Sequence, residues 1–208
     1  LGLKSGTVSA IAAEITTARE FIKENSTLSV LGGRGKIGSE NYGVALPKGN
    51  IEMKNKVDIF INYLKESGAY GNMVSRWIKS GTDSIQMPDI KSGNGAVLRV
   101  GLNAEYAPFE YVGEEGELLG FDIEFIKRFA AFYNMQLEFY ETTFSSLFLA
   151  LDEGKIDMII SAVAITEERQ QRYTFSNIYY ENEIVLLIDS LTNTGNVTSL
   201  EELEGKSI

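Results

Sequence analysis

The chain has 208 residues, 44% hydrophobic and 23% charged, a composition typical of a globular protein with one large domain or two small lobes. Its net charge of -10 argues against nucleic acid and anionic membrane surfaces as partners, because both attract basic faces. Cysteine and histidine are absent, which excludes disulfides, zinc sites built on thiolate or imidazole, and catalytic dyads or triads that use either residue.

The first 80 residues predict short strands and helices separated by glycine. Strands are expected at 8–13, where the apolar run VSAIAA suits a buried parallel strand, and at 26–30 and 42–46. Helices are expected at 16–25, 52–67 and 70–78. Gly6 is expected to end a helical turn at the start of the chain.

Residues 80–96 are rich in glycine, serine and aspartate and are the best linker candidate in the chain. The strands expected after this segment are 98–102, 136–140, 156–160 and 184–188. The helices expected there are 120–133, 144–151 and 167–172, with a helical turn at 199–203 and a last strand beginning at 205. Alternating strands and helices predict an α/β fold with mainly parallel sheets.

Residues 1–11 and 149–159 share the spacing L-x-L-x-x-G followed by a short aliphatic run. Helix, glycine turn and strand are common in any α/β protein, so this similarity is either generic or the mark of two related lobes. In open α/β sheets the carboxyl ends of the strands line the ligand crevice. If there are two lobes, Glu14 and the stretch 161–164 would face a shared cleft, one from each lobe.

From Leu98 the sequence resembles the family 3 extracellular solute-binding proteins. The similarity lies in LRVGLNAEYAPFEYVGEEGELLGFDIEFIKRFA and in FSSLFLALDEGKIDMIISAVAITEERQQRYTFSNIYY, where Leu-x-x-Gly-x-Ile-Asp, Ile-Thr-x-Glu-Arg and Tyr-x-Phe-Ser follow one another. The resemblance implies a periplasmic binding protein type 2-like fold, with two α/β lobes joined by hinge strands. It also implies an extracytoplasmic receptor for polar amino acids, with an ABC transporter permease as partner.

The order of the segments is rotated relative to that family, because SENYGVALPKGN and LKSGTVSAIAAEITTAREFIKEN resemble its later parts. We therefore expect late lobe 2 at 1–38, the C-terminal part of lobe 1 at 39–80, a linker at 81–97, the N-terminal part of lobe 1 at 98–188, and the hinge and start of lobe 2 at 189–208. Lobe 1 would be complete, and about 40 residues of lobe 2 would be missing. A cut across tandem domains and a circular permutation both give this order.

The chain opens within a pattern at Leu1, which we interpret as the end of an excised segment. It shows no signal peptide, and no apolar run approaches the roughly 18 residues of a membrane span. The resemblance nevertheless implies an extracytoplasmic location, with a membrane anchor in the parent protein. An incomplete lobe would expose strand edges, and exchange of elements between chains is then an open alternative.

The charged groups of an amino acid need opposite partners when they are buried. The resemblance assigns the ligand carboxylate to Arg169, whose planar fork suits bidentate pairing, against the alternative of a surface arginine in EERQQR. It assigns the ammonium group to Glu14, where the family usually has aspartate, against the alternative of a carboxylate that stabilises the following helix through its dipole. The backbone carbonyl near Ala162 is a second acceptor.

The resemblance also assigns the remainder of the site. Tyr106 and Phe144 match the family's aromatic walls, which favour cationic groups, and Asn103 matches a position that often contacts the ligand. Ala164 stands where the family often has serine or threonine, so one hydroxyl contact worth about 1 kcal/mol is absent. Ser161 would compensate only if its side chain points into the cleft.

A binding function is expected rather than an enzyme, because without histidine and cysteine only glutamate and aspartate remain as proton carriers, and none form a convincing catalytic pair. No cofactor or metal is expected. Two alternatives to the transport receptor stay open. One is a tandem ligand-sensing domain of a sensor kinase, with a sensor partner in place of the permease. The other is a truncated or permuted scaffold that binds nothing.

Overall fold

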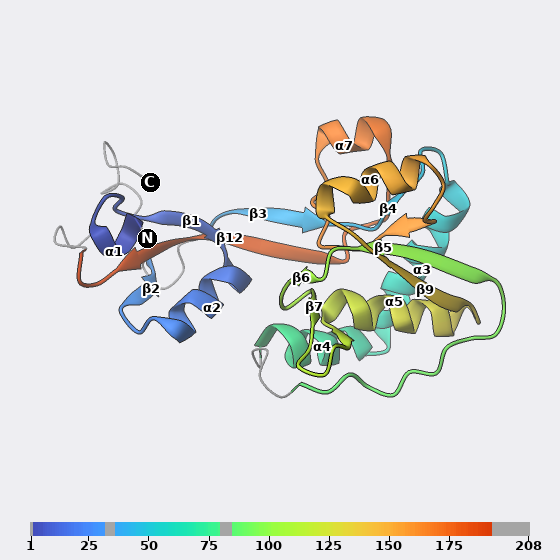
Figure 1. Ribbon diagram of the computed structural model, residues 1–208, viewed down its shortest axis with the longest axis horizontal. Coiled ribbons are helices and arrows are strands. Elements are labelled where there is room, and N and C mark those ends of the chain that lie inside the picture. Colours follow the sequence, from blue (N-terminus) through green and yellow to red (C-terminus); the bar gives the residue numbers. More distant parts are fainter. Residues whose placement is uncertain (1, 32–35, 80–84, 193–208) are drawn as a thin grey trace. The chain divides into compact units, whose positions relative to one another are not determined.

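The computed structural model describes residues 2–31, 36–79 and 85–192, which fall into two compact units (Figure 1). Unit 1 consists of the described residues of 1–40 and 181–208, and unit 2 of those of 41–180. The chain passes between the units twice, so each unit combines segments that are distant in sequence. The helical turn and last strand expected at the C-terminus lie outside the described residues.

Unit 1 is built on a four-stranded sheet in which β12 pairs with the other three strands, antiparallel to β1 and β2. The strands are β1 (Ile11–Glu14), β2 (Leu28–Val30), β3 (Lys36–Tyr42) and β12 (Tyr180–Asp189). The helices are α1 (Gly2–Ser5) and α2 (Ile15–Glu24). Apolar side chains of α1, α2, β2 and β12 form a core cluster in this unit, which consists of Leu3, Ala18, Leu28, Val185 and Leu187.

The buried parallel strand predicted at 8–13 is wrong in direction and in burial. Strand β1 begins at Ile11, pairs antiparallel with Ile184–Leu187 and lies at an edge of the sheet, where Ile11 and Ala12 are exposed. An apolar run reveals extended backbone but neither its direction nor its place in the sheet. The glycine turns of the two similar segments do agree, because Gly6 and Gly154 both have left-handed backbone with φ of 70° and 68°.

Unit 2 contains a five-stranded sheet with the order β11-β4-β10-β5-β9. Its strands are β4 (Ala45–Leu46), β5 (Val97–Leu102), β9 (Gln136–Glu141), β10 (Met158–Ile159) and β11 (Thr174–Phe175). Strands β10, β5 and β9 are parallel, whereas β4 is antiparallel to both of its neighbours. The single strand expected at 42–46 is wrong, because β3 ends at Tyr42 and β4 begins at Ala45.

A small antiparallel sheet is inserted between β5 and the helix that follows it, and its strands are β6 (Glu105–Tyr106), β7 (Glu110–Val112) and β8 (Leu118–Leu119). The sequence patterns did not predict it. The helices of unit 2 are α3 (Ile51–Glu66), α4 (Ala69–Met73), the π-helical η2 (Val74–Lys79), α5 (Phe121–Phe132), α6 (Phe144–Asp152) and α7 (Glu167–Arg172). Helices α5 and α6 cover opposite faces of the five-stranded sheet (Figure 1).

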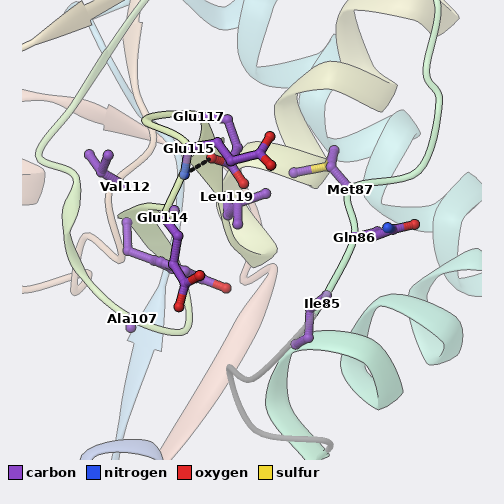
Figure 2. Close-up of a pocket in the computed structure, with 11 residues that line it drawn as sticks. Ile85, Gln86, Met87, Ala107, Val112, Glu114, Glu115, Glu117 and Leu119 are labelled. Atoms are coloured by element: carbon purple, nitrogen blue, oxygen red, sulfur yellow. Dashed lines mark hydrogen bonds between the residues drawn. The ribbon is translucent and has the colours of Figure 1, made fainter.

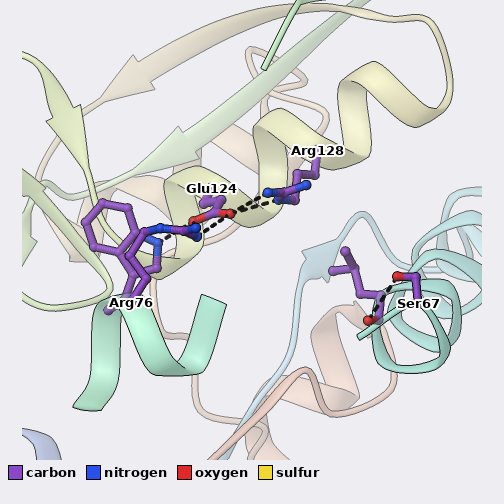
Figure 3. A network of polar contacts seen from close by, with 6 residues as sticks. Ser67, Arg76, Glu124 and Arg128 are labelled. Atoms are coloured by element: carbon purple, nitrogen blue, oxygen red, sulfur yellow. Dashed lines mark hydrogen bonds and ion pairs between the residues drawn. The ribbon is translucent and has the colours of Figure 1, made fainter. Parts of the chain in front are cut away.

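One fully buried carboxylate joins the early and late segments of unit 2. Glu124 in α5 accepts hydrogen bonds from the Arg76 guanidinium at 2.7 and 2.9 Å and from Trp77 Nε1 at 2.6 Å. Arg128, one turn further along α5, donates its Nε to the same carboxylate at 2.8 Å (Figure 3). Two guanidinium groups and an indole N–H therefore offset the loss of hydration of this charge.

The described part of the predicted linker, residues 85–96, is not a free tether but belongs to unit 2 and lies against the remainder of that unit, and we call it the strap. Gly93 N donates to Met135 O at 3.0 Å, and Gly95 N donates to Asn134 O at 2.9 Å. A Cβ atom on Gly93 would lie 2.2 Å from the Asn134 carbonyl carbon, so the two backbones are in contact. Ile85, at the start of the strap, packs against the main core of unit 2, by which we mean the cluster of buried apolar side chains that includes Phe60, Trp77, Phe109 and Phe125.

The boundaries of the units differ from the predicted segments at both crossings, and unit 1 extends to Glu40 where the sequence placed the first boundary after residue 38. Residues from Glu181 onward belong to unit 1, because β12 pairs there with β1 and β2, whereas the sequence placed 98–188 together in lobe 1. The assignment of the units to lobes of a larger protein stays a prediction. None of the helices within the described ranges has the length and apolar character that a membrane span requires.

Candidate functional site

The carboxyl ends of two parallel strands of unit 2 bring several predicted residues together. Strands β5 and β10 pair with Ile159 opposite Gly101, so the residues that follow each strand are neighbours. Asn103 N donates to Ser161 Oγ at 3.1 Å, which joins the two strand ends directly. This edge of a parallel sheet is where open α/β proteins hold ligands.

Arg169 lies in the first turn of α7. Its backbone N–H donates a hydrogen bond to the side-chain oxygen of Thr166, the N-cap residue of this helix. Its Nη1 donates to Ala164 O at 2.9 Å, and its guanidinium carbon lies 5.4 Å from the ring centroids of both Phe144 and Phe148. Within the described part of the chain no carboxylate forms an ion pair with this half-buried side chain. The rings and one carbonyl hold the cation, and its other N–H groups remain to bind an anion.

A pocket of ≈ 420 Å³ opens beside this arginine. It is lined by residues of α6 and α7 and by the residue that follows α7, namely Phe144, Ser145, Phe148, Glu168, Arg169, Arg172 and Tyr173. The aromatic wall that the sequence assigned to Phe144 is therefore continued by Phe148, which no sequence pattern singled out. The i, i+4 spacing of the two phenylalanines on one helix was the available signal.

The other predicted residues of unit 2 lie around the same strand ends. Tyr106 stacks on Phe109 with ring centroids 5.7 Å apart, and Tyr106, Ala162 and Ala164 all pack against the main core. The Asn103 amide donates to the exposed Glu105 carboxylate at 3.3 Å. These positions are half-buried, so each presents part of its surface to solvent.

Ser161 is buried, and its hydroxyl faces the interior of the protein. It donates to Glu110 Oε1 at 2.8 Å and accepts from Asn103 N. The condition under which it would replace the hydroxyl missing at Ala164, a side chain in the cleft, is not met in this conformation. Ala162 beside it has left-handed backbone with φ of 45° and donates its N–H to Asp122 Oδ2 at 2.8 Å.

The buried carboxyl groups of Glu110 and Asp122 thus accept hydrogen bonds from two residues of the predicted site, Ser161 and Ala162. Burial, followed by the nearby Asp122 charge, raises the pKa of Glu110 well above its ordinary value. Burial likewise raises the pKa of Asp122, to about 7, although N–H and O–H donors oppose the shift. The sequence displayed both carboxyls inside apolar stretches, FEYV and GFDI, and this was the signal by which they could have been found.

Glu14 is the one predicted residue in unit 1. It ends β1 and immediately precedes α2, where its backbone is extended and its side chain makes no capping hydrogen bond to the helix. Its side chain is half-buried within unit 1.

A larger hollow of ≈ 820 Å³ lies elsewhere on unit 2, between the strap and the β7–β8 hairpin (Figure 2). Three glutamates at its rim, Glu114, Glu115 and Glu117, make it acidic. None of the eight predicted ligand residues lines it. Among the described residues there is also no group of three or more acidic side chains arranged to hold a metal ion.

Residues 98–198 match the family model described as Bacterial extracellular solute-binding proteins, family 3. The chain is 31% identical over 131 residues to the L-cystine-binding protein TcyJ of Escherichia coli (strain K12), covering 63% of this chain and 48% of that protein. It is 36% identical over 111 residues to the histidine-binding periplasmic protein of the same strain, covering 53% and 42%. The chain therefore spans about half the length of the curated relatives it matches.

Among solved structures, the chain is similar to a mutant of the arginine-bound form of domain 1 from TmArgBP. The identity is 31% and the TM-score 0.41, and the match covers 52% of this chain and 86% of that one. A second similar structure is the L-cystine solute receptor of Neisseria gonorrhoeae in its unliganded open conformation, with 34% identity, a TM-score of 0.36, and coverage of 36% of this chain and 33% of that one.

Proposed function

Because residues 98–198 are those of a family 3 extracellular solute-binding protein, we propose that the chain is the receptor of an ABC importer and binds an amino acid by its α-carboxylate and α-amino groups. The fold is α/β and of the periplasmic binding protein type 2 class, as the sequence predicted. The relatives are named as binding proteins for cystine and histidine. The interlobe cleft, the permease partner and the membrane-anchored extracytoplasmic location belong to the proposal.

One observation carries the proposal, which is the environment of Arg169. Its guanidinium is half-buried, is held by two aromatic rings and the Ala164 carbonyl, and borders a pocket. A fixed cation that lacks a carboxylate partner among the described side chains suits an incoming carboxylate, because a bidentate pair satisfies both groups at once. Asn103, which directly follows β5, would contact the ligand from the edge of the sheet where β5 and β10 end.

The other proposed contacts follow from the chemistry of a zwitterion. Glu14 and the backbone carbonyl near Ala162 would accept hydrogen bonds from the ammonium group, and Tyr106 and Phe144 would enclose the side chain of the ligand. Aromatic faces favour cationic groups, so a polar or cationic amino acid is the expected ligand. Ser161 and Ala164 would line the site mainly with backbone, since the Ser161 hydroxyl is engaged inside the protein.

We propose no catalytic step for the chain. Two alternatives follow from the sequence order rather than from the site. The rotated order fits a tandem ligand-sensing domain of a sensor kinase, and it fits equally a truncated or permuted scaffold that binds nothing.

Isothermal titration calorimetry of the chain against L-arginine, L-histidine, L-cystine and L-glutamine tests the proposal. We expect heat of binding with at least one of them, and its loss in Arg169→Glu. The matched control is Lys155→Glu, whose exposed ammonium group pairs with Glu153 at 2.6 Å outside the pocket and should tolerate charge reversal with little effect on affinity. Absence of binding by the wild-type chain, or unchanged binding in Arg169→Glu, would contradict the proposal.

A further inference from the structure

Two carboxyl groups meet beneath the Ser161–Ala162 segment. Glu110 in β7 and Asp122 in α5 are 1% and 0% exposed. They are brought together at Gly120, whose φ of 126° lets the start of α5 lie directly on the hairpin. Asp122 N donates to Phe109 O at 2.9 Å, which fixes the helix against the strand next to Glu110.

Each carboxyl group accepts a hydrogen bond from one residue of the Ser161–Ala162 segment. Glu110 Oε1 accepts from the Ser161 hydroxyl, and Asp122 Oδ2 accepts from Ala162 N and from the Tyr179 hydroxyl, each at 2.8 Å. Through Ser161 the network reaches the backbone N–H of Asn103. The pair therefore binds two of the residues proposed to line the amino-acid site, Ser161 and Ala162, and reaches a third, Asn103, through Ser161.

One oxygen on each carboxyl group, Glu110 Oε2 and Asp122 Oδ1, is buried without a donor from any other described residue. The two side chains are nevertheless within hydrogen-bonding reach of each other. Two ionised carboxylates cannot form such a bond, because neither carries a hydrogen. One proton held between the two groups would supply the donor that this buried pair lacks.

We propose that Glu110 and Asp122 share one proton and act as positioning residues that hold Ser161, Ala162 and Asn103 in their binding conformation. The positioning role rests on the proposed function, whereas the shared proton does not. Removing the proton would place two like charges side by side in a buried site, which strongly favours either reprotonation or movement of the segment above. Amino-acid binding should then weaken as the pH rises.

The surroundings of the pair contain little that would stabilise the doubly ionised form. Tyr179, from the segment before β12, is the titratable group in contact with it, and burial raises the pKa of that tyrosine. Tyr42, at the end of β3, acts in turn on Tyr179. Among the described residues no lysine or arginine acts on either carboxyl. Desolvation and mutual repulsion are therefore unopposed by a cation.

Carbon-13 NMR of the side-chain carboxyl carbons across a pH titration tests the shared proton without any ligand. Glu110→Gln and Asp122→Asn assign the two signals. We expect linked titrations above the ordinary values of about 4, and a lower pKa for Asp122 once the amide of Glu110→Gln donates in place of the proton. Independent titration of both groups near those ordinary values would overturn the proposal, and the wild-type spectrum alone decides this if a variant does not fold.

Calorimetry at neutral and alkaline pH then tests the positioning role. We expect Glu110→Gln to keep its affinity within about threefold and to lose the pH dependence, and Glu110→Ala to bind about tenfold more weakly, as for one lost hydrogen bond. Glu114→Gln, exposed on the same hairpin, is the control. Wild-type affinity in Glu110→Ala would overturn the positioning role. A wild-type chain that binds no amino acid overturns the proposed function and the positioning role together, and leaves the NMR titration to judge the proton.

Discussion

Phe148 lies as close to the Arg169 guanidinium carbon as Phe144 does, with both ring centroids at 5.4 Å. The two phenylalanines are one helical turn apart on α6, and their ring centroids are 5.8 Å from each other. Phe148 also contacts Tyr173, with ring centroids 5.0 Å apart. The guanidinium therefore packs against two rings of a cluster of three aromatic side chains. Arg169 is thereby held in place before any ligand arrives.

Replacing Phe148 with alanine should weaken amino-acid binding by about 0.5–2 kcal/mol, because the guanidinium loses one of its two aromatic faces. Leucine at this position keeps apolar volume but not the ring, and should lose affinity as well. Leu149→Ala, on the exposed face of the same helix, is the control. Calorimetry measures the affinities, and equal binding by Phe148→Ala and wild type would show that Phe144 alone positions the arginine.

Removing the buried charge of Glu124 should destabilise unit 2 by about 3–5 kcal/mol, because Glu124→Ala leaves two guanidinium groups without their partner. Glu52→Gln is the control, since its ion pair with Lys56 is exposed to solvent and should contribute little to stability. Urea unfolding of both variants measures the difference. A Glu124→Ala midpoint equal to that of Glu52→Gln would contradict the central role of this carboxylate.

Gly120→Ala should disrupt unit 2, because a Cβ atom there would lie 2.0 Å from Phe109 O. Gly116→Ala separates this clash from the cost of left-handed backbone, since Gly116 has φ of 84° but open space around it. We expect the control to lose only about 1 kcal/mol. Circular dichroism during urea unfolding compares them, and similar midpoints would show that the contact is not tight.

Asp122→Asn should flatten the pH dependence of stability. The pKa of Asp122 in the folded chain is about 7, above its ordinary value, so folding favours the protonated form. Its contribution to the free energy of unfolding is therefore full below about pH 4 and is lost as the pH rises to about 7. Urea midpoints across this range, compared between Asp122→Asn and wild type, check the sign. An equal slope in both proteins would contradict it.

The sequence predicted several elements of unit 2 to within one residue at each end. The helix expected at 167–172 is confirmed at both ends, and the strand and helix expected at 98–102 and 120–133 are displaced by one residue at most. The helix expected at 70–78 is wrong in form, because it is α-helical only to Met73 and continues as a π-helix. Local patterns do not contain the packing that changes the winding of a helix.

Arg169 and Phe144 could be proposed as ligand residues from a resemblance, but the contact of Phe144 and Phe148 with the Arg169 guanidinium could not. The contacts among α6, α7 and the strand ends depend on how distant segments pack. The same holds for Glu110 and Asp122, which are 12 positions apart in sequence and meet because the β7–β8 hairpin ends, and α5 begins, at Gly120. The direction of β1 in unit 1 could not be predicted for a similar reason, since β1 pairs with residues far along the chain.

The docked strap has a consequence for proteolysis. Trypsin cleavage after the exposed Lys91 would sever the peptide between the early helices and the later strands of unit 2. The two fragments would nevertheless stay associated, because Arg76 and Trp77 on one side bind Glu124 on the other. A nicked chain should therefore elute at its original size in gel filtration and separate into two bands only when it is denatured.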